Sequence, residues 1–192
     1  MAVVLPGKFV YLCTPHTGSN ATVAALKKIP GVVNVKDSAG KVTYHSTLEQ
    51  IRTVQELVGT ELVFSAVRNP YDTLVSWYLR NRSYRGYKPG LGFVDFFREW
   101  MKRDPWPYVH DGTLFYHAGA SQIVMRYERG IEKEVNSVLR KIAGMPQVRL
   151  DLENETEGKD HWSTYYDEKS YAWVNETFRD DIANFGYRFL WG

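Results

Sequence analysis

The fold is decided by the stretch Leu62-Val63-Phe64-Ser65-Ala66-Val67-Arg68-Asn69-Pro70-Tyr71-Asp72. Its first six residues form a continuous apolar run, which is typical of a strand that is covered on both faces. Asn69 is a good helix N-cap, and Pro70 is favoured at the first helical position. The stretch therefore predicts a buried strand over residues 62–67 that leads through a short turn into a helix.

A second stretch earlier in the chain has the same organisation. The apolar run Phe9-Val10-Tyr11-Leu12-Cys13 is followed by the turn Thr14-Pro15-His16-Thr17-Gly18-Ser19-Asn20 and by a helix-like segment over residues 21–28. The first N–H groups of a helix have no intrahelical partner, so such turns direct donors toward an anion. Two such turns, one of them with an arginine, predict a ligand that carries two separated phosphates.

The rest of the chain continues the alternation of strands and helices. We expect a hairpin from residues 32–35 and 41–44, and a helix in which Ser46 and Glu49 form a capping box. Further segments predict a short helix near residues 93–102, a strand over 122–127, a helix over 131–143 and a closing amphipathic helix over 171–184. This order predicts one domain, residues 1–192, of three α/β/α layers with a mainly parallel central sheet.

Composition and charge narrow the function classes. The 192 residues have a formal net charge of only +2, which argues against a general nucleic-acid binder. Between residues 80 and 103, however, the sequence has seven basic residues and only two acidic ones, which indicates either an anionic ligand or a solvated basic face. The single cysteine, Cys13, excludes an intrachain disulfide, and we expect a buried, inert thiol. The sequence has neither a signal-peptide pattern nor an apolar run of membrane-spanning length, so we expect a soluble cytoplasmic protein.

The first turn has the chemistry of a phosphate-binding loop. Thr17-Gly18-Ser19-Asn20 offers small residues, which let the backbone approach a phosphate, and hydroxyls, which add donors. It lacks the Gly-Lys-Ser/Thr of a Walker A loop, which weakens a kinase or GTPase interpretation. Taken alone, the segment fits an ordinary turn between a strand and a helix better than a phosphate site.

The second turn is more specific. Arg68 stands at the end of its strand and can make bidentate contacts to a phosphate, and Ser76 can add a hydroxyl from the following helix. Asp72 falls in the first helical turn, where a negative charge is favourable, so we expect it to stabilise the start of the helix.

Together these segments resemble the PAPS-dependent sulfotransferases, particularly the branch that includes carbohydrate sulfotransferases. Pro15-His16-Thr17-Gly18-Ser19 is similar to the family's 5′-phosphosulfate loop, usually Pro-Lys-x-Gly-Ser/Thr-Thr. The segment from Val67 to Ser76 resembles the 3′-phosphate motif almost residue for residue. Further matches in the same order are Tyr44-His45-Ser46-Thr47, Arg126-Tyr127-Glu128, Tyr165-Tyr166-Asp167 and Asp181-x-x-x-Phe185-Gly186-Tyr187.

The resemblance implies a P-loop-like α/β fold and a compact bacterial or phage-type enzyme of the cytoplasm. It implies transfer of a sulfuryl group from PAPS, without a metal, to a hydroxyl or amine of an acceptor, with a carbohydrate as the candidate class. Adenosine 3′,5′-bisphosphate would be the second product. Arg68 and Ser76 would bind the 3′-phosphate. The residues expected around the 5′-phosphosulfate are Thr17, Gly18, Ser19, Asn20 and Ala21.

Two positions depart from the family pattern. His16 stands where the family has Lys or Arg, and it would stabilise the leaving oxygen either as a cation or as a neutral hydrogen-bond donor. Asn20 replaces a hydroxyl residue. The departures predict either reduced or pH-sensitive activity, or a degenerate module that binds PAPS without transferring sulfate.

His45 is the candidate general base, because a neutral imidazole suits deprotonation of a hydroxyl; the alternative is that it helps to cap the following helix. Glu49 and Glu128 are reserve bases. The other histidines, His110, His117 and His161, are expected on the surface or in loops. Four aromatic residues could stack on sugar rings or serve only packing: Tyr84, Tyr87, Trp106 and Tyr108. The sequence determines neither the acceptor nor the oligomeric state, and it predicts no nucleic-acid or membrane partner.

Overall fold

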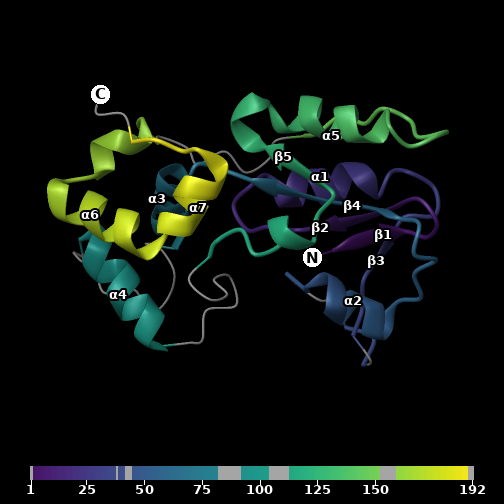
Figure 1. Ribbon diagram of the computed structural model, residues 1–192, viewed down its shortest axis with the longest axis horizontal. Coiled ribbons are helices and arrows are strands. Elements are labelled where there is room, and N and C mark those ends of the chain that lie inside the picture. Colours follow the sequence, from purple (N-terminus) through teal and green to yellow (C-terminus); the bar gives the residue numbers. More distant parts are fainter. Residues whose placement is uncertain are drawn as a thin grey trace. The chain divides into compact units, whose positions relative to one another are not determined.

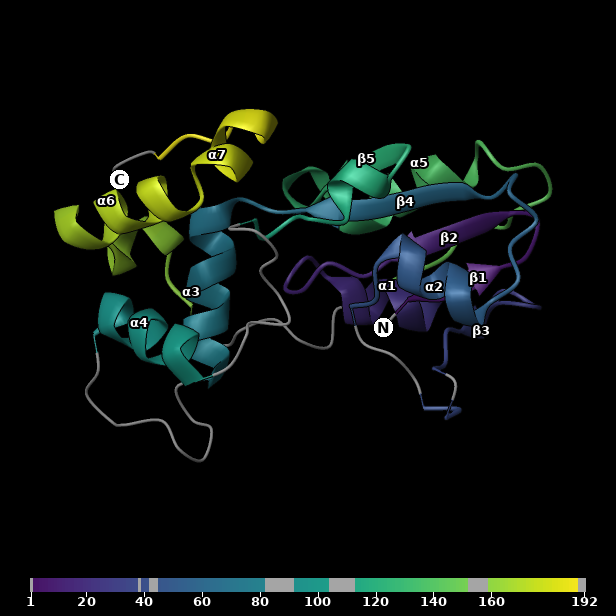
Figure 2. The same ribbon diagram turned by 60° about the horizontal axis from the view of Figure 1, so that its bottom comes forward.

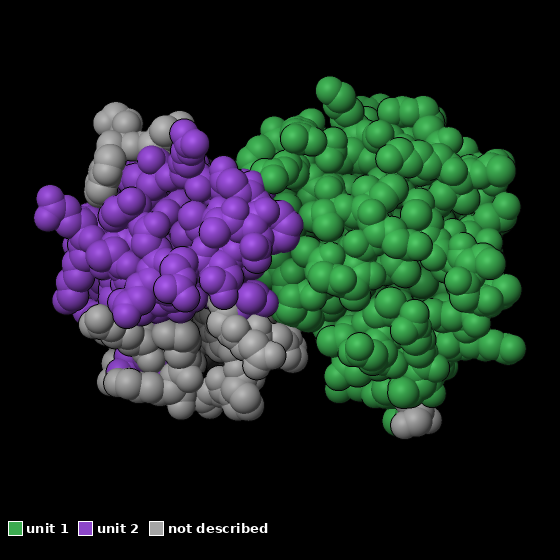
Figure 3. Space-filling view, in the orientation of Figure 1, with its two compact units in different colours: residues 1–67, 115–154 green, residues 68–114, 155–192 purple. Residues whose placement is uncertain are grey.

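The computed structural model describes residues 2–37, 39–41, 45–81, 92–103, 113–151 and 159–189. Tyr44, His110, the four candidate stacking aromatics and much of the basic stretch lie outside these ranges. The chain forms two compact units, which are coloured separately in Figure 3. Unit 1 comprises residues 1–67 and 115–154, and unit 2 comprises residues 68–114 and 155–192. The single-domain organisation stays a prediction.

Unit 1 is built on a five-stranded sheet with the strand order β3-β1-β2-β4-β5. The strands are β1 (Val3–Leu5), β2 (Phe9–Leu12), β3 (Val33–Asn34), β4 (Leu62–Val67) and β5 (Ile123–Arg126). β4 pairs in parallel with both β2 and β5, whereas β1 pairs antiparallel with both β2 and β3. The predicted α/β class is confirmed, with a mixed sheet whose parallel part is formed by β2, β4 and β5.

The antiparallel strand β1 has no counterpart in the sequence-based prediction. A tight turn joins it to β2: the Lys8 N–H donates to the Leu5 carbonyl at 3.0 Å, and Gly7 adopts φ 70°. So short a connection permits only an antiparallel pair, since a parallel pair needs a long crossover. The turn thus explains why the sheet is mixed.

Helices cover both faces of this sheet. Along β2, the side chains of Phe9 and Tyr11 pack with α1 (Ser19–Leu26) and α5 (Ile131–Leu139) in one core cluster. The alternate residues Val10 and Leu12 pack with α2 (Leu48–Val54) in another. Figure 1 shows α5 and α2 on opposite sides of the strands. Every residue of β2 is buried, as a strand covered on both faces requires.

The start of α2 differs by one residue from the predicted one. The capping box uses Thr47 and Gln50 rather than Ser46 and Glu49. The Gln50 N–H donates to Thr47 Oγ1 at 3.3 Å, and the Thr47 N–H donates to Gln50 Oε1 at 2.9 Å. Ser46 is instead buried ahead of the helix. Both neighbours are competent caps, so the reciprocal bond to Gln50 selects Thr47.

The predicted closing helix is two helices, α6 (Glu168–Thr177) and α7 (Arg179–Phe185). Phe178 interrupts them with a non-helical backbone, φ −115° and ψ 30°, and buries its ring. α6 also begins earlier than predicted, because Asp167 and Ser170 form a capping box.

Unit 2 is helical and largely aromatic inside. It contains α3 (Pro70–Asn81), α4 (Phe93–Arg103), the 3₁₀ turn η3 (Trp162–Tyr165), α6 and α7, which Figure 2 shows from a second side. The Tyr71 ring stacks on Trp162 at 5.5 Å between ring centroids. The buried Asp181 accepts the Leu114 N–H at 2.7 Å and so fastens α7 to the chain that leaves the unit. Two further 3₁₀ turns, η1 (Ala118–Ala120) and η2 (Tyr127–Arg129), belong to unit 1.

Candidate functional site

Two buried threonine hydroxyls donate hydrogen bonds to backbone carbonyls of the turn after β2. Thr17 Oγ1 donates to the Thr14 carbonyl at 2.8 Å, and Thr22 Oγ1 donates to the Gly18 carbonyl at 3.0 Å. Both threonines are fully buried. The hydroxyl of Thr17 therefore shapes the turn, and the donors that this turn offers to an anion are the N–H groups at the start of α1.

Gly18 is required at this point for two reasons. It is the N-cap of α1 and has a left-handed backbone, φ 75° and ψ 18°. A Cβ atom here would lie 3.3 Å from Tyr127 Cε2 and 3.4 Å from Ile131 Cγ2. The first turn of α1 also contains no acidic residue, so its positive dipole end favours a negatively charged group.

The remaining predicted residues of this turn differ in their exposure. Ser19, the first residue of α1, is buried, Ala21 is half-buried, and Asn20 is exposed. His16 is half-buried and has φ 58°, a left-handed conformation that costs a non-glycine residue about 1–2 kcal/mol. Backbone strain of this kind concentrates at functional sites.

His45 is tied to the beginning of the same turn. Its Nδ1 lies 2.8 Å from the carbonyl oxygen of Cys13, the residue that precedes Thr14. A carbonyl only accepts, so Nδ1 carries the hydrogen of the neutral ring and Nε2 keeps the basic lone pair. Burial lowers the pKa of His45 to about 4, although the hydrogen bond to Cys13 opposes the shift. At pH 7 the ring is therefore neutral.

The reserve bases, the thiol and the other described histidines differ in their burial. Glu49 and Glu128 are exposed on α2 and η2. Cys13 is buried, as expected, and burial raises the pKa of its thiol to about 12, which disfavours the reactive thiolate. His161 is exposed, as predicted. His117 lies in the turn before η1, in agreement with the predicted surface or loop position, but its side chain is buried beside the Tyr116 ring.

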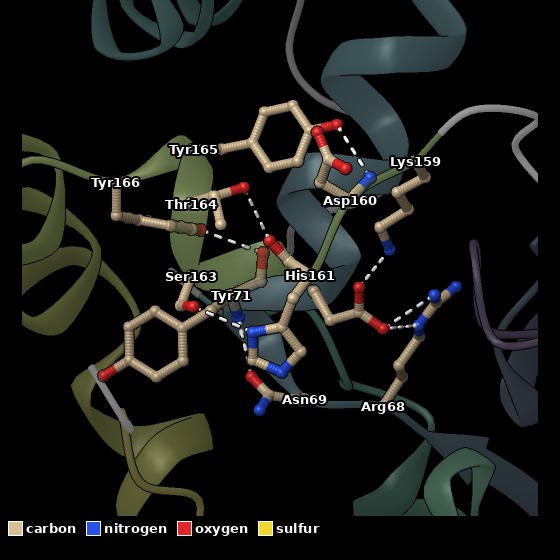
Figure 4. A network of polar contacts seen from close by, with 11 residues as sticks. Arg68, Asn69, Tyr71, Lys159, Asp160, His161, Ser163, Thr164, Tyr165 and Tyr166 are labelled. Carbon is tan, nitrogen blue, oxygen red and sulfur yellow. Dashed lines mark hydrogen bonds and ion pairs between the residues drawn. The ribbon is translucent and has the colours of Figure 1, made fainter. Parts of the chain in front are cut away.

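In unit 2, a cluster of three charged side chains surrounds the start of α3 (Figure 4). Arg68 donates to Asp72 Oδ2 from Nε at 2.8 Å and from Nη2 at 2.7 Å. Lys159 Nζ donates to the other oxygen, Asp72 Oδ1. The three side chains keep only 11–15% of their surface exposed, and their formal charges leave an excess of one positive charge. Asp72 thus pairs with two cations in addition to its predicted place at the helix start.

The surroundings of this cluster favour an anion. Asn69 Oδ1 accepts the Tyr71 N–H at 3.0 Å, so Asn69 caps α3 as predicted. Ser76 is buried one turn beyond Asp72 on the same face of α3. Burial lowers the pKa of Lys159, and the Asp72 carboxylate opposes that shift. The cluster and Ser76 provide cationic and hydroxyl donors of the kind that bind phosphate.

Sequence reasoning missed Lys159. It lies 87 positions from Asp72, in a segment that reads as a polar loop, and no spacing rule connects the two residues. Arg68 and Asp72, by contrast, lie only four positions apart, after the end of β4 and in the first turn of α3.

The structure thus provides two groups of candidate residues, each described within its own unit: the turn with His45 in unit 1, and the Arg68, Asp72 and Lys159 cluster with Ser76 in unit 2. Over the described ranges, no three His, Cys, Asp or Glu side chains gather as a metal ion would need. No helix in the described part of the chain is both long enough and apolar enough to cross a membrane.

Comparison with solved structures identifies the fold. The mouse sulfotransferase SULT7A1 complexed with PAP matches with a TM-score of 0.54 and 16% sequence identity, over 93% of this chain and 84% of that one. Retinol dehydratase in a complex with retinol and PAP matches with a TM-score of 0.40 and 12% identity, over 68% of this chain and 50% of that one, and this weaker likeness carries no argument. No protein-family model and no curated protein sequence matches significantly. The resemblance to PAPS-dependent sulfotransferases is therefore confirmed as a fold, which this chain shares.

Proposed function

We propose that this chain, which has the sulfotransferase fold, transfers a sulfuryl group from PAPS to the hydroxyl or amine of an acceptor. The observation that carries the proposal is the largely buried cluster in which Arg68 and Lys159 share the carboxylate of Asp72. Two cations on one carboxylate keep a net positive charge where the sequence resembles a 3′-phosphate motif.

The two groups of candidate residues would bind different ends of PAPS. Arg68, Lys159 and Ser76 would hold the 3′-phosphate through charge-assisted and hydroxyl hydrogen bonds. The N–H groups of residues 17–21 would hold the 5′ end, where the helix dipole favours negative charge. PAPS supplies the sulfuryl group and leaves as adenosine 3′,5′-bisphosphate, and no metal takes part in the proposal.

His45 is proposed as the general base. Its Nε2 lone pair accepts the proton of the acceptor hydroxyl while that oxygen forms its bond to sulfur. A base with a pKa of about 4 is weak at neutral pH. An anionic ligand nearby raises the pKa of an imidazole, so donor binding would strengthen this base.

His16 is proposed to stabilise the leaving oxygen of the phosphate. Once the sulfur–oxygen bond breaks, negative charge develops on that oxygen, and a hydrogen-bond donor directed at it lowers the barrier. His16 donates in either protonation state, but with a full positive charge only when protonated. Activity that depends on pH is therefore the expected signature of this role.

For the acceptor, we propose a chemical class and no specific compound. We infer an acidic glycan hydroxyl, because seven basic residues between positions 80 and 103 suit an anionic acceptor. The same proposal places the protein in the cytoplasm of a bacterial or phage-infected cell. It includes no nucleic-acid or membrane partner.

The test is transfer of labelled sulfate from PAPS to a panel of glycans, peptides and small hydroxyl compounds. We expect labelled acceptor and adenosine 3′,5′-bisphosphate in equal amounts, with the rate strongly reduced in Arg68→Ala. Arg179→Ala is the matched control, because Arg179 is exposed in the same unit and pairs only loosely, at 3.7 Å, with Asp180.

A second candidate function is a PAPS-binding module without transferase activity. The replacement of the family's cation by His16 and of a hydroxyl by Asn20 favours it. Tight nucleotide binding together with no labelled product from any acceptor, with a known sulfotransferase as positive control, would support this candidate over the enzyme.

A further inference from the structure

We propose that Tyr116 is a positioning residue that holds His45 in the conformation in which Nε2 serves as the base. The proposal rests on the proposed function, because the role of Nε2 comes from there. The Tyr116 hydroxyl donates to the backbone carbonyl of His45 at 3.1 Å.

The backbone of His45 needs support from its surroundings. With φ 60° it lies in the left-handed region, which an L-residue occupies only when its surroundings compensate the cost. The direction of a carbonyl follows from the backbone dihedrals, so a donor aligned with the His45 carbonyl favours this conformation over the extended one. The Tyr116 hydroxyl is such a donor.

The ring of His45 is held separately from its backbone. The hydrogen bond from His45 Nδ1 to the Cys13 carbonyl, 2.8 Å long, fixes both the ring orientation and the tautomer. That bond requires the backbone of His45 to bring the ring to the end of β2. His45 is thus held at two points: Tyr116 binds its backbone carbonyl, and Cys13 binds its ring.

Tyr116 is itself held in place. Its ring lies against the buried ring of His117, with 4.1 Å between centroids. The His117 carbonyl accepts the Ser121 hydroxyl at 2.8 Å, and Ser121 Oγ lies 2.9 Å from Ser65 Oγ in β4. Tyr116 is therefore connected to the central strand of the parallel part of the sheet, so its hydroxyl is held and not free to follow His45.

The experiment compares the wild type with Tyr116→Phe, which removes only the hydroxyl. The ¹⁵N chemical shifts of the His45 ring at pH 7, in protein without nucleotide, report its tautomer. We expect the Nδ1–H form in the wild type and a shift toward the Nε2–H form in Tyr116→Phe. A wild-type ring in the Nε2–H form, or an unchanged ring in the variant, overturns the proposal.

Tyr166→Phe is the matched control, because the Tyr166 hydroxyl also donates to a backbone carbonyl, that of Tyr71, at 2.9 Å, but in unit 2. A merely structural role for the Tyr116 hydroxyl predicts that both variants lower the melting temperature and leave the tautomer of His45 unchanged. If Tyr116→Phe does not fold, the wild type still provides a test, because a His45 ring in the Nε2–H form would overturn the proposal.

Kinetics separate this proposal from the proposed function. We expect kcat to fall about tenfold or more in Tyr116→Phe with little change in the KM for PAPS, since only the base is displaced. A changed tautomer without sulfate transfer in the wild type would contradict the enzyme but not the positioning. Transfer by the wild type with an unchanged tautomer and kcat in the variant would contradict the positioning alone.

Discussion

Replacing Asp72 by Asn tests the charged cluster of unit 2. Each oxygen of the carboxylate binds one cation: Arg68 binds Oδ2 at 2.7–2.8 Å, and Lys159 binds Oδ1. An amide keeps the shape of the side chain but loses the charge, and its NH₂ group must face one of the two cations. The variant therefore leaves two largely buried positive charges without their shared anion.

The magnitude follows from the burial of the cluster. Removing one partner of a fully buried ion pair costs about 3–5 kcal/mol in unfolding free energy. The side chains here keep 11–15% of their surface exposed, so water recovers part of that cost. We expect a loss of about 2–3 kcal/mol, which lowers the melting temperature of a chain of this length by about 5–10 °C.

The assay is thermal unfolding of both proteins at low ionic strength, with Asp180→Asn as the control. Asp180 is exposed and lies 3.7 Å from Arg179, so its loss should cost at most a few tenths of a kcal/mol. If Asp72→Asn is destabilised no more than Asp180→Asn, the cluster does not contribute as described. Adenosine 3′,5′-bisphosphate should stabilise Asp72→Asn more than the wild type, because the variant has a larger positive charge to neutralise.

Two further predictions concern unit 1. Gly18→Ala should lose about 1–2 kcal/mol in urea unfolding, because alanine must adopt φ 75° and its Cβ would lie 3.3 Å from Tyr127; an unchanged midpoint would contradict the requirement for glycine. The carboxylate of Glu61 is buried and accepts three backbone N–H groups; burial alone would raise its pKa, but these hydrogen bonds outweigh burial and lower it. A lowered pKa stabilises the folded state above the ordinary carboxyl pKa of about 4.3, and the gain is lost as the pH falls through the folded-state value. Urea midpoints measured from pH 7 to pH 3 should therefore fall less steeply in Glu61→Gln than in the wild type, and equal slopes would contradict the prediction.

Much of the fold follows from local sequence signals. The apolar run of residues 62–67 became β4, and the Asn69-Pro70 signal became the start of α3, because burial on both faces and helix capping are properties of short segments. The break at Phe178 could not be predicted, because the apolar period is the same for one helix or for two with a buried residue between them. β1 was missed because its three residues form a strand only through the turn at Gly7.

In the candidate sites, too, local features could be predicted from the sequence and contacts between distant positions could not. Arg68 and the turn at Gly18 were predicted, since each lies between a strand and the helix that follows it in the sequence. Lys159 and Tyr116 were not, because their contacts join positions 87 and 71 residues apart. The left-handed backbone of His45 was equally hidden, since nothing in the local sequence requires it.

The most direct test is a calorimetric titration with adenosine 3′,5′-bisphosphate and with AMP, which lacks the 3′-phosphate. A charge-assisted hydrogen bond contributes about 1.5–3 kcal/mol, so an arginine that binds the 3′-phosphate should give about 100-fold tighter binding of the bisphosphate. We expect that difference in the wild type and in Arg179→Ala, and its loss in Arg68→Ala. Equal affinity of the wild type for both nucleotides would contradict the assignment of Arg68 to a 3′-phosphate and, with it, the proposed use of PAPS.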